Sequence, residues 1–200
     1  MDEWLNVQGT KEWHIARKKR LGGSEIASVM RLSPYKTRLE LWEEKTGARE
    51  VQNISHLPHV QRGIEAEPIA REKLERILHV KYTTPVLTDP DHEWMAASLD
   101  GICDEHTLEI KTMSKDKHED VAWGWVPDYY ECQVQWGLMI SGKRRGLFAS
   151  YRPEDETLYW VWIARDDKRI AEMRQAAIEF WGWVEKGTRP PDDYEFNFNL

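Results

Sequence analysis

The feature that most constrains the fold is a pair of short apolar runs around a turn-prone segment. Residues 96–103 and 107–112 flank an Asp-Glu-His segment, an arrangement typical of a β-hairpin. On the second run Glu109 and Lys111 are two residues apart, so a strand projects both from one face while Ile110 points to the other. Because unpaired charge is costly to bury, we expect the charged face to be functional.

Asp100 lies in the first run of this hairpin, just before Gly101, where a backbone or ligand can approach closely. With Glu109 and Lys111, it would place two carboxylates and an ammonium around one point. Carboxylate oxygens hold hard divalent cations, which activate water for phosphodiester hydrolysis. The alternative is a set of solvated side chains near strand ends, because this loose pattern often arises by chance.

The length and composition predict a single domain over residues 1–200, since 200 residues that are 40% hydrophobic can build a packed core. No apolar run approaches the roughly 18 residues of a membrane-spanning helix, and residues 1–4 are not typical of a signal peptide. Cys103 and Cys132 are far apart, which favours free thiols over a disulfide or zinc site. We therefore expect a cytoplasmic protein that contacts no membrane.

The charge pattern disfavours one class of function. A formal net charge of −7 argues against a protein that coats nucleic acid, but not against an enzyme that acts on it, because phosphate contacts are local. Residues 17–20 and 143–145 are the local basic clusters. From composition alone, the first is expected to be a solvated helix end.

Hydrophobic periodicity and turn residues predict helices interspersed with short strands. Ser24 is expected to cap the second helix, and Thr37 with Glu40 to form a capping box for the third. This order predicts an α+β fold with a mixed central sheet flanked by helices. The expected helices cover residues 13–19, 25–31, 38–46, 63–79, 128–141 and 166–186; the expected strands, besides the hairpin, cover 80–87, 146–152 and 158–165; a loop is expected over 48–60.

Five separated segments then fall into one order. They are Trp13-His14…Arg17 leading to Leu21-Gly22-Gly23-Ser24, Arg62-Gly63…Glu67, Ser98…Asp100-Gly101, Glu109-Ile110-Lys111, and Tyr130…Gln133-Val134-Gln135. None is specific alone. Together, over residues 11–165, they resemble the YqaJ-type viral recombinases, the λ-exonuclease-like group of the PD-(D/E)XK nuclease superfamily. The resemblance implies a restriction-endonuclease-like core of sandwiched helices and sheet, followed by a C-terminal helix and extended tail over 166–200.

The resemblance implies a two-metal site. Asp100, Glu109 and the backbone carbonyl of Ile110 would hold Mg²⁺, for which Mn²⁺ could substitute, because these are hard oxygen donors. Glu67 would complete a second metal position, so that attacking and leaving oxygens are both stabilised. The alternative for Glu67 is a solvated helix carboxylate.

The resemblance also implies roles for residues around the metals. Lys111 would position and help deprotonate the attacking water, and Gln133 would help hold it; the alternative for Gln133 is a packing amide. Arg17, Ser24 and Ser98 would form a pocket for a terminal 5′-phosphate. Their alternatives are a surface charge, an ordinary N-cap and a small strand residue.

The implied activity is a Mg²⁺-dependent 5′→3′ exonuclease acting on the ends of double-stranded DNA. It would release mononucleotides and leave 3′ overhangs for a single-strand annealing protein in phage-type recombination, working as a ring-shaped homotrimer. Two alternatives stay open. One is a structure-specific or restriction-like endonuclease of the same superfamily, and the other is a non-catalytic DNA-binding subunit.

Two apolar features are candidates for further DNA contacts. Leu57 or Val60, in the loop expected before Gly63, would act as a wedge that unstacks the duplex end. Trp123 and Trp125 would stack on bases. Trp is so frequent in this chain, with 11 residues, that a packing role is favoured for both.

Overall fold

The computed structural model describes residues 17–52 and 54–191. Of the helix expected over 13–19, only the helical end at Arg17 and Lys18 is described. Trp13 and His14, and the end of the predicted extended tail, lie outside the described residues.

The larger sheet has four strands and is mixed. Its order is β4 (Gly101–Ile102), β5 (Thr107–Lys111), β6 (Arg145–Arg152) and β7 (Thr157–Ala164). β5 and β6 are parallel, whereas β4–β5 and β6–β7 are antiparallel. The strand pair expected after residue 145 is therefore confirmed, and so is the mixed sheet.

The hairpin is confirmed, but its first run is divided between two sheets. Residues 95–98 form β3 (Met95–Ser98), which pairs with β1 (Leu21–Gly22) in parallel and with β2 (Val86–Thr88) in antiparallel orientation. Only β4 continues alongside β5. Asp100 thus lies where the chain crosses from the three-stranded sheet to the four-stranded sheet.

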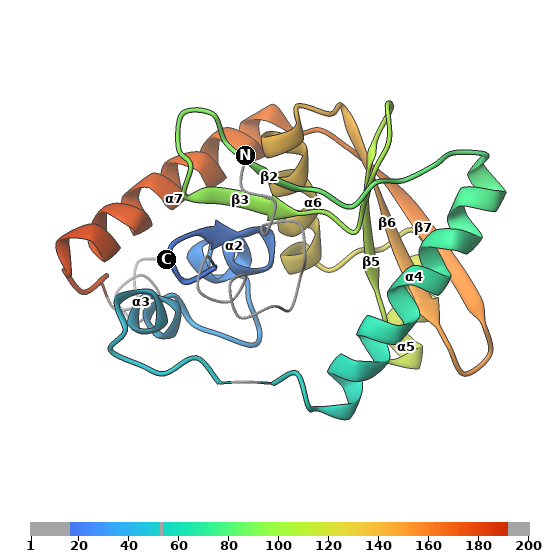
Figure 1. The fold of residues 1–200 in the computed structure, drawn as a ribbon, viewed down its shortest axis with the longest axis horizontal. Helices are drawn as coiled ribbons and strands as arrows, with labels where there is room; N and C mark the ends of the chain where they lie inside the picture. The colour runs from blue at the N-terminus through green and yellow to red at the C-terminus, as the bar shows by residue number, and fades with distance from the viewer. Residues whose placement is uncertain (1–16, 53, 192–200) are drawn as a thin grey trace, which may run out of the picture.

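The helices of the described part surround these sheets (Figure 1). They are α2 (Gly23–Val29), α3 (Arg38–Thr46), α4 (Pro58–Leu78), α5 (Lys115–Ala122), α6 (Asp128–Ser141) and α7 (Asp167–Lys186). The capping box of Thr37 with Glu40 is confirmed, and Gly47 ends α3 in a left-handed conformation with φ of 80°. The α+β class expected from the sequence is confirmed.

Three local predictions were wrong. Ser24 is not the N-cap of α2, because Gly22 takes that position and its N–H donates to the Glu25 carboxylate at 2.9 Å. The predicted loop ends earlier than expected, since α4 begins at Pro58, a residue well suited to a first helical position. The strand expected over 80–87 is reduced to Val86–Thr88, and α5 was not predicted.

The four-stranded sheet separates two apolar clusters. On one side, α4 packs small residues, Ala66 and Ala70, with Leu74 against Ile110 and its neighbours. On the other side, residues of α2, α6 and α7 form a larger cluster that includes Phe148. Ile69 and Ile77 of the same helix are not part of this cluster, since they are exposed by 47% and 50%.

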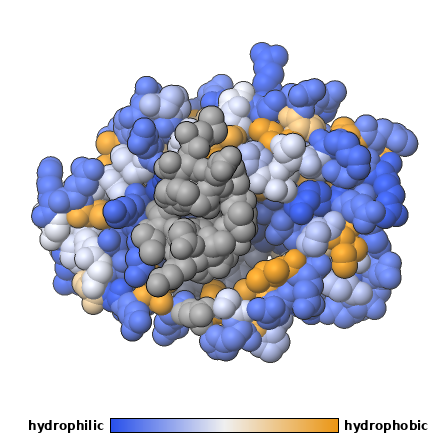
Figure 2. Space-filling view, viewed as in Figure 1, coloured by the Kyte–Doolittle hydropathy of each residue, from blue (hydrophilic) through white to orange (hydrophobic). Residues whose placement is uncertain are grey.

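The surface seen from the side of Figure 1 is mostly hydrophilic, with hydrophobic residues in small separated areas (Figure 2). Among the described residues, no helix combines the length and apolar character needed to cross a membrane.

Candidate active site

Asp100, Glu109 and Lys111 lie together at β5, as the sequence predicts. The Ile110 N–H donates to Oδ2 of Asp100 at 2.8 Å, which fixes the crossing residue against the strand. Lys111 Nζ donates to the Glu109 carboxylate in a short ion pair. Glu109 is only 5% exposed, so the pair is removed from bulk water.

The two carboxylates are not fully compensated by this lysine. Burial raises the pKa of Asp100 well above its ordinary value, and the neighbouring Glu109 adds to the rise. Burial also raises the pKa of Glu109, although Lys111 opposes the shift. Burial alone would lower the pKa of Lys111, but Glu109 and Asp100 outweigh it and raise the pKa overall. The site therefore places two buried carboxyl groups beside a single lysine.

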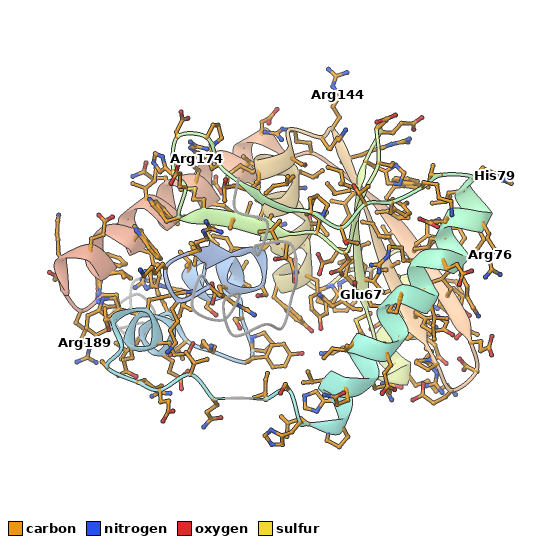
Figure 3. All side chains as sticks on the ribbon, in the orientation of Figure 1. Glu67, Arg76, His79, Arg144, Arg174 and Arg189 are labelled. Carbon is orange, nitrogen blue, oxygen red and sulfur yellow. The ribbon has the colours of Figure 1, made fainter. Side chains whose placement is uncertain are left out.

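Glu67 reaches the same site from α4, and Figure 3 shows it on that helix beside the sheet. It raises the pKa of both Asp100 and Glu109, which places its charge close to theirs. Its own carboxylate accepts a hydrogen bond from Arg71 Nη1 at 2.8 Å, and the same nitrogen donates to the Asp100 carbonyl at 2.7 Å. Arg71 thus ties α4 to the crossing between the sheets.

The sequence analysis did not identify Arg71 as a site residue. The signal was available, because Glu67 and Arg71 are four residues apart on a helix and oppositely charged. Such pairs are frequent on solvated helix faces, however, and the second contact, to the Asp100 carbonyl, depends on tertiary structure.

Gln133 approaches from α6. Burial raises the pKa of Glu109, and the nearby Gln133 amide acts against this rise. Gln135, two residues on, contacts the segment between β7 and α7. Its Nε2 donates to the Ala164 carbonyl at 2.8 Å, and its Oε1 accepts from the Asp166 N–H at 3.0 Å. The two amides thus have different surroundings, as expected for positions i and i+2 of a helix.

The residues present fit a hard divalent cation held by few carboxylates. Among residues 17–52 and 54–191, no three His, Cys, Asp or Glu side chains are grouped as a ready metal-binding set. Glu67 is instead paired with Arg71. Mg²⁺ commonly takes one or two carboxylates and completes its shell with water and phosphate, so Asp100 and Glu109 suit it. The participation of Glu67 stays a prediction.

The residues expected to bind a 5′-phosphate are partly brought together. Arg17 Nη2 donates to Ser24 Oγ at 2.8 Å, and Arg17 Nε lies 3.8 Å from Glu25 Oε1. Ser98 ends β3, two residues after Ala96, which pairs with Gly22 just before α2. The role of all three in phosphate binding stays a prediction.

The wedge candidates lie at the start of α4. Leu57 is its N-cap and Val60 lies in its first turn. A Cβ added at Gly63, one turn further on, would meet Thr112 Oγ1 at 3.4 Å, so this end of α4 lies beside the residue after Lys111. Both candidates therefore lie near the site.

The tryptophans between α5 and α6 differ from the favoured prediction. Trp123 is 89% exposed and Trp125 is 52% exposed, so a packing role is wrong for Trp123 and incomplete for Trp125. Gly124 between them has a left-handed φ of 86°, and the Trp125 N–H donates to the Asp120 carbonyl at 3.0 Å, which ends α5.

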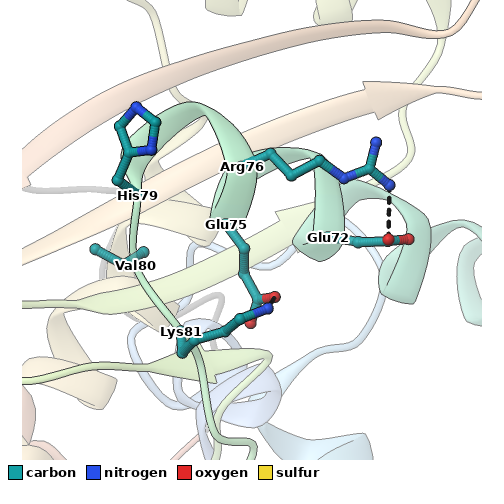
Figure 4. Close-up of a pocket in the computed structure, with 6 residues that line it drawn as sticks. All are labelled: Glu72, Glu75, Arg76, His79, Val80 and Lys81. Carbon is teal, nitrogen blue, oxygen red and sulfur yellow. Dashed lines mark hydrogen bonds and ion pairs between the residues drawn. The ribbon is translucent and has the colours of Figure 1, made fainter.

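A depression of about 410 Å³ lies at the other end of α4, apart from these residues (Figure 4). It is lined by Glu72, Glu75, Arg76, His79, Val80 and Lys81. Its charged lining side chains pair with one another, Arg76 with Glu72 and Lys81 with Glu75. None of its lining residues was a candidate from the sequence.

Comparisons with known proteins identify a family for this chain and structures that share its fold. Residues 12–144 match the YqaJ-like viral recombinase domain. The uncharacterized protein YqaJ of Bacillus subtilis (strain 168) is 29% identical over 185 residues, which cover 90% of this chain and 58% of that protein. The chain therefore spans less than two thirds of this curated relative.

Solved structures show the same architecture. The alkaline exonuclease LHK-Exo from Laribacter hongkongensis is 28% identical, with a TM-score of 0.76, and the match covers 90% of this chain and 94% of that one. Its complex with dAMP gives a TM-score of 0.74 at the same identity and coverage. A phage-related exonuclease from Haemophilus somnus 129PT shares the fold, with a TM-score of 0.60 at 11% identity over 84% of this chain and 94% of that one.

Proposed function

This chain belongs to the YqaJ-like viral recombinase domain family, and from that membership and the site we propose that it is a Mg²⁺-dependent exonuclease of double-stranded DNA. It degrades one strand from the 5′ end, releases mononucleotides and leaves 3′ overhangs. The solved relative LHK-Exo is an alkaline exonuclease with a complex with dAMP, a mononucleotide of the kind such an enzyme releases.

One observation carries the proposal. Two buried carboxylates with raised pKa, Asp100 and Glu109, lie beside the ammonium of Lys111 at one end of β5. Two neighbouring buried carboxylates destabilise a fold unless a cation offsets their charge. Their presence here therefore favours a role in catalysis or metal binding over a structural role.

Each residue has a role in this proposal. Asp100, Glu109 and the Ile110 carbonyl would hold Mg²⁺, for which Mn²⁺ could substitute, and the bound cation would supply Lewis-acid activation of water and phosphate. Lys111 would position that water and offset the negative charge that develops on the phosphate oxygens. Gln133 helps to hold the water and keeps Glu109 oriented.

The remaining predicted residues would act on the DNA rather than on the metal. Arg17, Ser24 and Ser98 anchor the 5′-phosphate, because a guanidinium forms charge-assisted bonds to phosphate oxygens. Glu67, by contrast, would be a ligand of a second cation. Its ion pair with Arg71 would then have to break, or its carboxylate would have to contact Arg71 and the cation together.

We further propose that the protein acts as a homotrimer around DNA, with a single-strand annealing protein as its partner. A ring reconciles the net charge of −7 with DNA binding, because only the channel must be positive. Localisation in the cytoplasm follows from this role in recombination.

The test is time-resolved digestion of linear duplex DNA bearing either 5′-phosphate or 5′-hydroxyl ends, with and without Mg²⁺. We expect Mg²⁺-dependent release of mononucleotides from phosphorylated 5′ ends and intact covalently closed circles. Lys111→Met should abolish release; because it also removes the counter-ion of buried Glu109, circular dichroism must show that the variant is folded.

Other outcomes would replace the proposal. Cleavage of closed circles would favour an endonuclease, and binding of duplex ends without any digestion would favour a non-catalytic subunit. Equal rates on phosphorylated and hydroxyl ends would remove Arg17, Ser24 and Ser98 from the mechanism.

A further inference from the structure

Three tyrosine rings connect the candidate active site to the surface. Lys111 Nζ lies 5.5 Å from the centre of the Tyr130 ring. The Tyr130 and Tyr129 rings are 4.4 Å apart, and the Tyr129 and Tyr35 rings meet edge to face at 5.8 Å. The Tyr35 ring, at the end of this series, is 71% exposed.

Tyr35 is exposed but held in place. It comes from the segment between α2 and α3, where Ser33 Oγ accepts from the N–H groups of Tyr35 and Lys36 and so closes a turn. The Tyr35 ring also packs edge to face against Tyr129, at the start of α6. The turn thus fixes the backbone of Tyr35 and α6 supports its ring, which is the pre-organisation that a binding surface needs.

Positive charge accompanies these rings. Lys117, from α5, donates to the Tyr129 hydroxyl at 2.9 Å, and its ammonium lies 5.5 Å from the centre of that ring. Lys111 has the equivalent place over Tyr130. Aromatic faces bordered by ammonium groups suit single-stranded nucleic acid, in which flat bases alternate with anionic phosphates. A docked protein segment would not require this alternation.

We propose that Tyr35, Tyr129 and Tyr130 form a stacking subsite for unpaired bases of the DNA strand next to the active site, with Lys117 contacting its phosphates. The subsite deepens the proposed nuclease function and rests on it for the identity of the strand. Tyr35 presents the exposed ring on which a base stacks. Tyr129 and Tyr130, both on α6, lie between this ring and Lys111.

The test measures binding without catalysis. Fluorescence anisotropy, in a chelator, compares a single-stranded oligonucleotide with one of equal length whose bases are replaced by abasic sites. We expect the normal strand to bind the unaltered protein more tightly than the abasic one. Tyr35→Ala should lower affinity for the normal strand about 5- to 100-fold and leave abasic binding within about twofold, since one stacked base contributes about 1–3 kcal/mol.

Two variants control for structure. Tyr35→Phe keeps the ring and should retain most of the base-dependent binding. Tyr159→Ala removes another partly exposed aromatic side chain, 37% exposed on β7, and should change neither oligonucleotide. Thermal unfolding checks that all variants fold.

The outcomes separate this inference from the proposed function. If Tyr35→Ala weakens the normal and abasic strands equally, or neither, the stacking subsite is wrong even if DNA is digested. If base-dependent binding is lost in Tyr35→Ala but the unaltered protein digests no DNA, the subsite stands and the nuclease proposal fails. In an active enzyme, Tyr35→Ala should raise KM with little change in kcat.

Discussion

Two regions of the molecule bury carboxylates and treat their charge in opposite ways. Beside α3, the Glu25 carboxylate accepts hydrogen bonds from Lys45 Nζ at 2.8 Å and from the Gly22 N–H at 2.9 Å. Burial alone would raise the pKa of Glu25, but Lys45 and Arg17 outweigh it and lower the pKa overall. At β5, burial raises the pKa of Asp100 and Glu109 despite Lys111.

The difference distinguishes an ion cluster that holds the fold from one that holds a ligand. Lys45 Nζ also donates to the carbonyls of Arg17 at 3.0 Å and Arg20 at 2.6 Å, so every partner in that cluster is satisfied within the protein. The β5 cluster instead holds two buried carboxyl groups against one lysine, and burial raises the pKa of both. Stability should therefore depend on the first cluster, and activity on the second.

The largest effect is expected from Lys45→Met. It leaves Glu25 buried without its counter-ion and removes the donor to two backbone carbonyls. Breaking a buried ion pair from one side costs about 3–5 kcal/mol of unfolding free energy. Urea denaturation monitored by circular dichroism measures this cost.

Lys36→Met is the matched control for that prediction. Lys36, just before α3, pairs with Glu44 of that helix at 2.5 Å, but its side chain is 33% exposed, against 4% for Lys45. Because water still reaches the Lys36 ammonium, this variant should lose less stability than Lys45→Met. Similar losses in both variants would mean that Lys45 has no special structural role.

The next largest effect is expected at β5, where a substitution should reduce activity but not stability. Asp100→Asn keeps the shape of the side chain and an oxygen that can accept from the Ile110 N–H. It should reduce the rate of DNA digestion by at least about 100-fold, because a cation ligand worth several kcal/mol in the transition state is lost. Without divalent cations, the variant should be as stable as the unaltered protein or more stable by about 1 kcal/mol, because one buried charge is gone.

Glu105→Gln controls for the loss of a carboxylate elsewhere on the hairpin, since Glu105 is 69% exposed at its side chain and pairs with Arg145. Its digestion rate and stability should both stay near the unaltered values. A strong destabilisation of metal-free Asp100→Asn would contradict the contrast, because β5 would then resemble the Glu25 cluster.

The sequence predicted what depends on local pattern. The hairpin, the capping box of Thr37 and the helix over 128–141 were all confirmed, because alternation, caps and helical periodicity are encoded within short windows. The family resemblance then brought together residues that no window links, and the comparisons confirm the family.

What the sequence did not predict depends on long-range packing. Lys45 looks like an ordinary helix lysine, yet its amine reaches a segment 20 residues or more away. Trp123 was expected to pack because tryptophan is so frequent in this chain, yet it is 89% exposed between α5 and α6. The same limit explains Arg71, whose second contact is with the crossing between two sheets.

Arg71→Gln should have a smaller effect than Asp100→Asn. The guanidinium holds Glu67 and the Asp100 carbonyl but lies outside the charged pair at β5. Losing a group that orients a ligand residue typically costs about 10–100-fold in metal affinity or activity. Titration calorimetry with Mg²⁺ and digestion rates should both show a reduction of about tenfold.

Arg76→Gln is the control on the same helix. Arg76 forms the same i,i+4 pair with Glu72, but the two side chains are 70% and 62% exposed, and Figure 3 shows Arg76 on the outer side of α4. It should leave Mg²⁺ binding unchanged. If Arg71→Gln behaves like Arg76→Gln, Arg71 is a surface residue and the link between α4 and the site is not needed.

The smallest effect is a pH dependence that belongs to the Glu25 cluster. Because the folded-state pKa of Glu25 is lowered from its ordinary 4.5, its contribution to stability is complete above that value and is lost as pH falls through the folded-state pKa. Glu25→Gln should therefore be less stable than the unaltered protein at neutral pH, and this difference in stability should narrow at acidic pH. Urea unfolding at a series of pH values measures the gap. A gap that stays constant, or widens in acid, would mean that Glu25 acts through packing rather than through its charge, and the electrostatic contrast with β5 would lose one of its two sides.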